Sequence, residues 1–141
     1  VRAWLSEFGI AMEEDAAYER LNTLAAECEP GHGLRVRTTF LGTRADPSVE
    51  AGAIEGITLD NMRLGALARA TLVGIVDELH ALHDTHASLT TPYREVVAAG
   101  GGVQRNPLMP GLIEARFGLP ARTSAHQETA AVGAVLAPEM R

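Results

Sequence analysis

A short apolar segment that runs into three consecutive glycines is the feature that most constrains the fold of this chain. Glu95–Ala99 has the pattern of a strand, and Gly100–Gly102 lies between it and a predicted helix. Glycines at such a junction let the backbone approach a ligand closely, and the free N–H groups at a helix start attract phosphate. Three glycines also serve structural turns, so this local pattern leaves both nucleotide contact and a purely structural turn open.

The residues after the glycines narrow the choice of fold. Asn106 followed by Pro107 fits a helix cap with proline in the first turn. The dinucleotide-binding fingerprint of the Rossmann fold does not match, because its third glycine would fall at Arg105. We therefore do not expect a classical dinucleotide domain.

Hydrophobic periodicity and glycine or proline breaks predict the other elements. The predicted helices are one that stops at Gly9, Glu14–Glu27, about Asn61–His83, one after the glycines that ends at Gly118, and Gln127–Met140. The predicted strands are Leu34–Phe40, Glu95–Ala99 and Leu119–Thr123. Leu41–Thr58 follows neither period and is predicted to be a long loop of the kind that is usually functional or makes an interface. Strands separated by helices indicate an α/β domain built around a sheet.

Composition indicates one soluble domain and limits its chemistry. With 141 residues and 46% hydrophobic residues, the chain can bury a core without disulfides or a structural metal. It has neither an apolar run long enough to span a membrane nor a signal-peptide pattern, so we expect a cytoplasmic protein with no membrane partner. A net charge of −6 disfavours nucleic acid as a partner. All 12 basic residues are arginine, which excludes mechanisms that need a lysine.

Two groups of residues resemble metal or redox sites but are better explained otherwise. His80, His83 and His86 are three residues apart, so on a helix the outer two diverge and converge poorly on one ion. We expect a solvated helix end there and no metal ligand in the chain. Cys28 has no second cysteine to pair with and is predicted to be a buried, inert thiol.

The remaining charged candidates have structural explanations. Asp77 and Glu78 are adjacent on the long helix and are expected to face solvent rather than form a carboxylate pair. Arg44 and Asp46 form an internal ion pair that fixes the long loop, or they face a substrate or partner domain. Glu128 in the first turn of the last predicted helix suits the helix dipole.

Several ordered segments resemble the C-terminal domain of the FGGY family of carbohydrate kinases. Gly100–Met109 is similar to the adenosine-binding glycine motif of that family, Phe117–Pro120 to the region of the following strand, and Glu128–Ala137 to the ending helix. Upstream, Phe40–Pro47 and Gly56–Asn61 resemble a loop and helix start that are closest to the sedoheptulokinase-like branch. The resemblance covers nearly the whole chain.

The resemblance implies a fold and an activity. The fold would be α/β, the C-terminal portion of an actin-like (ribonuclease H-like) ATPase domain with a mixed sheet flanked by helices. Residues 1–141 would be part of the nucleotide-binding domain, with the N-terminal sugar-binding domain absent. The parent protein would use ATP and Mg²⁺ to phosphorylate a sugar hydroxyl, with ATP in a cleft between two domains.

The same resemblance implies which residues contact the nucleotide. Gly100, Gly101 and Gly102 would approach it, and either Arg105 or Asn106 would lie near the adenosine. The general-base aspartate of the family, its phosphate-binding hairpin and its sugar-binding residues lie upstream of the matched region. We therefore expect no catalytic residue in this chain, which would be inactive alone because phosphoryl transfer needs both sides of the cleft.

Departures from the family pattern leave other functions open. Ala51 stands before Gly52, where the family often has arginine, which weakens any assignment of the sugar. One alternative is a non-catalytic nucleotide-binding or interaction module with the same fold, and another is an unrelated α/β domain whose glycine turn is structural. If parts of the fold are missing, the chain should expose apolar surface, mainly on the helix at about Asn61–His83, and self-associate.

Overall fold

The computed structural model describes residues 2–29, 33–40, 52–86 and 93–125. The chain divides into two compact units, Val1–Glu78 and Leu79–Arg141, which are described separately below. The predicted last helix and the expectations for Arg44, Asp46, Ala51 and Glu128 lie outside the described residues.

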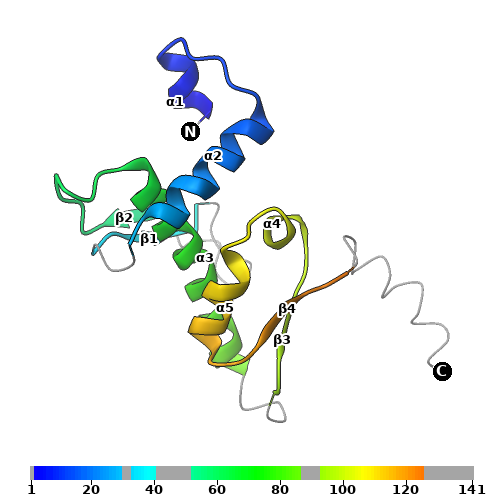
Figure 1. Ribbon diagram of the computed structural model, residues 1–141. Coiled ribbons are helices and arrows are strands. Elements are labelled where there is room, and N and C mark those ends of the chain that lie inside the picture. The colour runs from blue at the N-terminus through cyan, green and yellow to red at the C-terminus, as the bar shows by residue number, and fades with distance from the viewer. Residues whose placement is uncertain (1, 30–32, 41–51, 87–92, 126–141) are drawn as a thin grey trace. The chain divides into compact units, whose positions relative to one another are not determined.

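Two helices open the first unit (Figure 1). The first, α1 (Arg2–Glu7), ends where Gly9 takes a φ of 70° and donates its N–H to the Ser6 carbonyl at 3.0 Å. The second, α2 (Glu14–Glu27), has the predicted bounds, with acidic residues in its first turn that suit the helix dipole. It buries Ala17 and Ala25, which belong to the apolar face seen in the sequence.

A short antiparallel hairpin follows, and only one of its strands was predicted. In β1 (Arg35–Arg37), Val36 is buried between two exposed arginines, and it lies opposite Ile54 of β2 (Ala53–Glu55). The prediction of a continuous loop over Leu41–Thr58 is therefore wrong at β2. Three residues give too short an alternation to recognise in a sequence, and β2 is defined by its pairing with β1.

A loop held by Asn61 leads into the long helix α3 (Leu64–His86). The Asn61 side chain is almost completely buried, donates to the Gly56 carbonyl at 2.8 Å and accepts from the Thr58 N–H at 2.7 Å. The predicted helix start at about Asn61 is thus three residues too early, because α3 starts at Leu64 and these bonds of Asn61 fix the preceding loop.

Two glycines in α3 allow close packing within the first unit. A Cβ at Gly65 would overlap the Leu24 carbonyl oxygen of α2, and one at Gly74 would overlap the Val36 carbonyl oxygen of β1. Arg69, one turn after Gly65, donates from Nη1 to the Ala25 carbonyl at 3.2 Å, near the C-terminal end of α2. A cation there is favourable because the last helical carbonyls carry partial negative charge.

The second unit contains a parallel pair of strands and two further helices (Figure 1). Val96 in β3 (Val96–Ala98) lies opposite Ala121 in β4 (Ala121–Thr123). Between the strands come α4 (Gly101–Gln104) and α5 (Met109–Phe117), and α5 contacts both strands. The predicted single helix after the glycines is therefore two helices, whereas the predicted stop at Gly118 is confirmed by its left-handed φ of 64°.

The observed elements confirm the predicted α/β class. Strands and helices alternate, and apolar side chains such as Val76, Met109 and Ile113 are almost completely buried. In the described ranges, none of the helices is both long and apolar enough to cross a membrane.

Candidate functional site

The glycine turn begins immediately after β3. Gly100 has φ 101° and ψ 161°, a conformation that residues with a Cβ rarely adopt. Its carbonyl accepts the N–H groups of both Val103 and Gln104 at 3.2 Å, which closes the first turn of α4. A residue other than glycine at position 100 would therefore strain the connection between β3 and α4.

Packing against the part of the chain that the structure describes does not explain the next two glycines. Gly101 and Gly102 are exposed, and among the described residues no atom lies within 4 Å of a Cβ built at either position. Neither residue has a positive φ. Close approach of a molecule outside the chain is a physical reason for glycine at such positions.

The two polar candidates after the turn have different surroundings. Arg105 is exposed at the end of α4, and its N–H bonds to the Gly101 carbonyl at 3.0 Å. Asn106 is only 8% exposed, and its Oδ1 accepts the N–H of Leu108 at 3.0 Å. The structure thus places Arg105 at the surface and Asn106 in the interior of the corner between α4 and α5.

The predicted helix cap at Asn106–Pro107 is wrong in position. The helix α5 starts at Met109, and its N-cap residue, Leu108, makes no side-chain capping bond. The bond from Leu108 N–H to Asn106 instead stabilises the turn that precedes α5. Such turns are a common use of asparagine, since its side chain can imitate a backbone carbonyl.

Side-chain contacts that were not foreseen support the strands beneath the turn. Arg122 of β4 places its Nε 3.2 Å from both carboxylate oxygens of Glu95, just before β3. Glu114 of α5 accepts the Ala121 N–H at 3.0 Å, at the start of β4. The partners are 27 and 7 residues apart in the sequence, so these contacts become apparent only once the parallel pairing is known.

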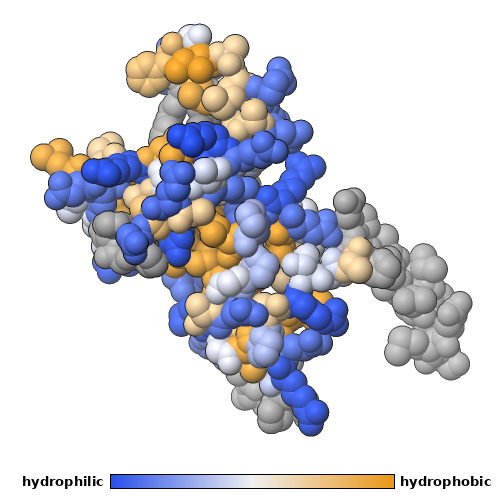
Figure 2. Space-filling view, viewed as in Figure 1, coloured by the Kyte–Doolittle hydropathy of each residue, from blue (hydrophilic) through white to orange (hydrophobic). Residues whose placement is uncertain are grey.

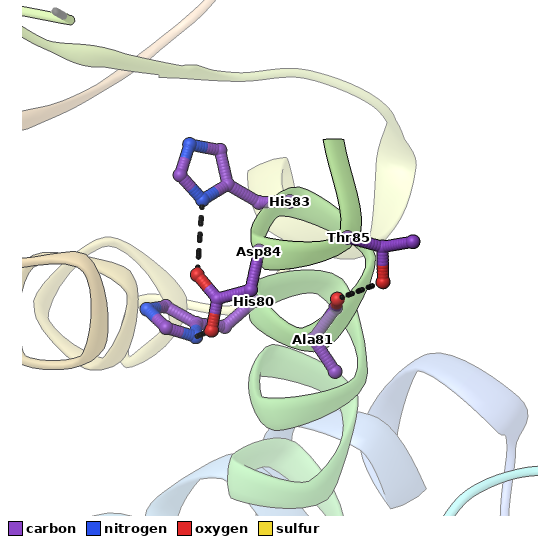
Figure 3. A network of polar contacts seen from close by, with 5 residues as sticks. All are labelled: His80, Ala81, His83, Asp84 and Thr85. Atoms are coloured by element: carbon purple, nitrogen blue, oxygen red, sulfur yellow. Dashed lines mark hydrogen bonds and ion pairs between the residues drawn. The ribbon is translucent and has the colours of Figure 1, made fainter. Parts of the chain in front are cut away.

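His80 and His83 of α3 are half-buried rather than solvated, so the prediction of a solvated helix end is wrong for these two residues. Asp84 lies with Oδ2 3.0 Å from His80 Nδ1 and Oδ1 3.4 Å from His83 Nδ1 (Figure 3). The ring of Phe117 lies 4.9 Å from that of His80 and 5.6 Å from that of His83. The described residues contain no group of three side chains suited to hold a metal ion, and these two histidines anchor α5.

Two smaller expectations also need correction. Asp77 is exposed as predicted, but Glu78 is half-buried and accepts the hydroxyl of Thr38 at 2.6 Å. Cys28 is half-buried at the end of α2 rather than buried, and its thiol lies 3.7 Å from the Glu29 carbonyl oxygen. Neither group belongs to the glycine turn.

Exposed apolar surface is confirmed, and it is not confined to the predicted helix at about Asn61–His83. The most exposed large apolar residues of the first unit are Leu59 at 97%, Phe8 at 82% and Met62 at 74%. Phe8 and Met62 line a cavity of about 490 Å³. Figure 2 shows apolar surface over α1 and over the loop that joins β2 to α3. Side chains of α3 such as Leu79 and Leu82 are about half-exposed.

Comparison with known proteins defines the class of protein. The FGGY family of carbohydrate kinases, C-terminal domain, matches residues 1–138, and the chain therefore belongs to this family. Among individual proteins, the chain is 28% identical to human sedoheptulokinase over 133 residues, which are 94% of this chain and 27% of that protein. It is also 28% identical to mouse sedoheptulokinase over 117 residues, 83% of this chain and 24% of that protein.

Solved structures confirm the fold. Xylulose kinase from Rhodospirillum rubrum has a TM-score of 0.71 at 23% identity, covering 94% of this chain and 28% of that one. Plasmodium falciparum glycerol kinase with ADP has a TM-score of 0.69 at 20% identity, covering 95% and 26%. The fold is thus that of the C-terminal part of these actin-like sugar kinases, as the resemblance implied. The chain spans about a quarter of the length of the curated relatives it matches.

Proposed function

We propose that this chain supplies part of the ATP-binding half of an ATP-dependent carbohydrate kinase. The observation that carries the proposal is the open glycine turn at Gly100–Gly102, which follows β3 directly in a chain of the FGGY family. Kinases of this family use ATP as phosphate donor. The sedoheptulokinase relatives favour a related sugar as the substrate of the parent protein.

The turn would bind the nucleotide through its backbone. The carbonyl of Gly100 receives the N–H groups of residues 103 and 104, so the helical pattern of α4 provides no acceptor for the N–H groups of Gly101 and Gly102. The absence of side chains there would let a nucleotide come within contact distance. Arg105 rather than Asn106 would lie near the adenosine, because the guanidinium is at the surface and can stack on a base.

The remaining parts of the reaction would come from the rest of the parent protein. The family resemblance would place the general base upstream of the matched residues, so the domain of residues 1–141 would bind nucleotide without catalysis, and an upstream domain would hold most of the sugar. Mg²⁺ would accompany the ATP phosphates rather than bind to ligands in this chain. Phosphoryl transfer depends on positioning and charge stabilisation from both sides of the cleft.

Three further expectations belong to the same proposal. The parent protein would be cytoplasmic, since a phosphorylated sugar and ATP are intracellular metabolites. The net charge of −6 on this chain would disfavour nucleic acid and anionic membranes as its partners. The isolated chain would self-associate through its exposed apolar surface.

A thermal-shift titration with Mg-ATP tests the proposed nucleotide site. A ligand that binds only the folded state stabilises it by about 2.7 kcal/mol at a hundredfold excess over Kd. The unmodified chain should therefore show a saturable rise in Tm. Gly101→Asp should abolish the rise, because it places a carboxylate where the phosphates approach.

Gly111→Asp is the matched control for this titration. Gly111 is also exposed and helical, and among the described residues no atom lies within 4 Å of a Cβ built there. This variant should keep the full rise in Tm. An equal response of both variants to ATP would contradict a nucleotide site at the turn.

A non-catalytic nucleotide-binding or interaction module is the second candidate function, because the family resemblance would place the general base upstream of these residues. An activity assay distinguishes the kinase from the non-catalytic module. The chain is expressed together with the upstream part encoded by its own gene, and ATP-dependent phosphorylation of sedoheptulose and xylulose is measured. Phosphate transfer to either sugar supports the kinase, and nucleotide binding without transfer supports the module.

A further inference from the structure

Asn106 is a buried polar residue whose groups bond along its own chain. Its Oδ1 accepts the Leu108 N–H at 3.0 Å, and its own N–H donates to the Val103 carbonyl at 3.3 Å. Its carbonyl accepts the N–H of Met109, the first residue of α5, at 3.2 Å. Asn106 therefore connects the end of α4 to the start of α5.

These bonds continue back to the glycine turn. The Arg105 N–H bonds to the Gly101 carbonyl at 3.0 Å, and the Val103 N–H bonds to the Gly100 carbonyl at 3.2 Å. A continuous path of hydrogen bonds thus runs from α5 through Asn106 to Gly100. Pro107 has no N–H to contribute, so the Leu108 N–H is the first donor after the corner.

We propose that Asn106 is a positioning residue of the nucleotide site: its carboxamide oxygen, bonded to Leu108 N–H, holds the corner that fixes the glycine turn and Arg105. This inference rests on the proposed function, and it gives the two adjacent polar residues separate roles. Arg105 faces the ligand, and Asn106 acts through the backbone.

Three substitutions distinguish positioning from direct contact with the nucleotide. Asn106→Ala removes the oxygen that accepts the Leu108 N–H. Asn106→Ser and Asn106→Asp keep an oxygen acceptor for this turn but lack the amide N–H donors. If the amide N–H donors of Asn106 contact the nucleotide directly, both polar variants should lose nucleotide binding as the alanine variant does. If Asn106 positions the turn, both polar variants should restore nucleotide binding.

The first measurement uses the nucleotide-free 141-residue chain. In Asn106→Ala, amide exchange of Leu108 should accelerate roughly fivefold to tenfold, the value expected for one net hydrogen bond. The amide NMR signals of Gly100–Gly102 should shift in the same variant. Asn106→Ser and Asn106→Asp should restore the exchange rate of Leu108 and the glycine signals, and Gly111→Ala should change neither.

The second measurement is the affinity for Mg-ATP at a temperature where every variant is folded. Asn106→Ala should bind more weakly by roughly the factor by which the Leu108 amide loses protection, and the serine and aspartate variants should bind like the unmodified chain. The proposal is overturned if alanine leaves the Leu108 and glycine signals unchanged. It is equally overturned if serine and aspartate protect Leu108 yet bind ATP as weakly as alanine. If the unmodified chain does not bind Mg-ATP, the proposed function fails for this chain, and the NMR signals still decide whether Asn106 holds the turn.

Discussion

Glycine residues in the helices of this chain have different tasks, and the surroundings of each one reveal which. Gly74 lies against the backbone of β1, where an added Cβ would overlap the Val36 carbonyl oxygen. Gly111 faces open space among the described residues, although it too lies within a helix. A sequence shows only the helix-propensity cost of either glycine, about 1 kcal/mol relative to alanine.

Gly74→Ala should therefore destabilise the first unit. Overpacking against a backbone carbonyl costs about 1–3 kcal/mol, more than alanine gains in helix propensity. Gly111→Ala should instead stabilise the chain by roughly 0.5–1 kcal/mol. Urea unfolding followed by the amide signals of Val36 and Ile113 would measure both, and equal effects of the two substitutions would contradict the packing seen at Gly74.

At the scale of elements, the histidine pair of α3 and the ring of Phe117 hold α5 in the second unit. The three rings pack with centroid distances of 4.9 and 5.6 Å from Phe117. The ring of Tyr93 also packs against this group, with its centroid 5.3 Å from that of His83. Since α5 also contacts β3 and β4, this cluster stabilises the second helix after the glycine turn.

Phe117→Ala should lower the free energy of unfolding of the second unit by about 1–3 kcal/mol, because it removes a half-buried ring and the packing that the ring provides. Phe117→Leu should recover part of this loss. The urea dependence of the Val96 and Ala98 amide signals is the measurement. Leu82→Ala is the control, since Leu82 lies on the same end of α3 and is 49% exposed. A loss as large in that control would mean that the ring cluster has no special role.

The same elements show what can be predicted from the sequence. The 14 residues of α2 repeat their apolar face over several turns, which made its bounds predictable, and the glycine turn follows from local residues alone. The strand β2 and the bond between Thr38 and Glu78 were missed because they depend on partners distant in sequence, 40 residues apart in the second case. The burial of Asn106 was missed for a related reason: its inward orientation depends on the corner that separates α4 from α5.

At the scale of the whole chain, the exposed apolar surface predicts self-association. The chain spans about a quarter of its relatives' length, and residues such as Phe8 and Met62 are 82% and 74% exposed. Surface of this kind in an isolated chain favours association. We therefore expect copies of the chain to associate through the exposed apolar residues of the first unit and not through α3 alone.

Phe8→Ser combined with Met62→Ser should lower the weight-average mass seen by sedimentation or light scattering towards that of a 15.0 kDa monomer. Leu79→Ser combined with Leu82→Ser should have the smaller effect, because these side chains are only about half-exposed. If the substitutions at Leu79 and Leu82 have the larger effect, copies of the chain associate through the long helix α3. A monomeric unmodified chain would rule out the association itself.

The conformation of Gly100 has a consequence for how this gene can change. Every missense change of one base in a glycine codon introduces a residue with a Cβ, and at a φ of 101° any such residue carries backbone strain of roughly 1–3 kcal/mol. The neighbouring codons for Gly101 and Gly102 carry no such backbone penalty. Inherited variation at the first position should therefore be removed by loss of folded protein. Under the proposed function, variation at the next two should be removed by loss of nucleotide binding, so that allele frequencies at three adjacent codons would record two different kinds of selection.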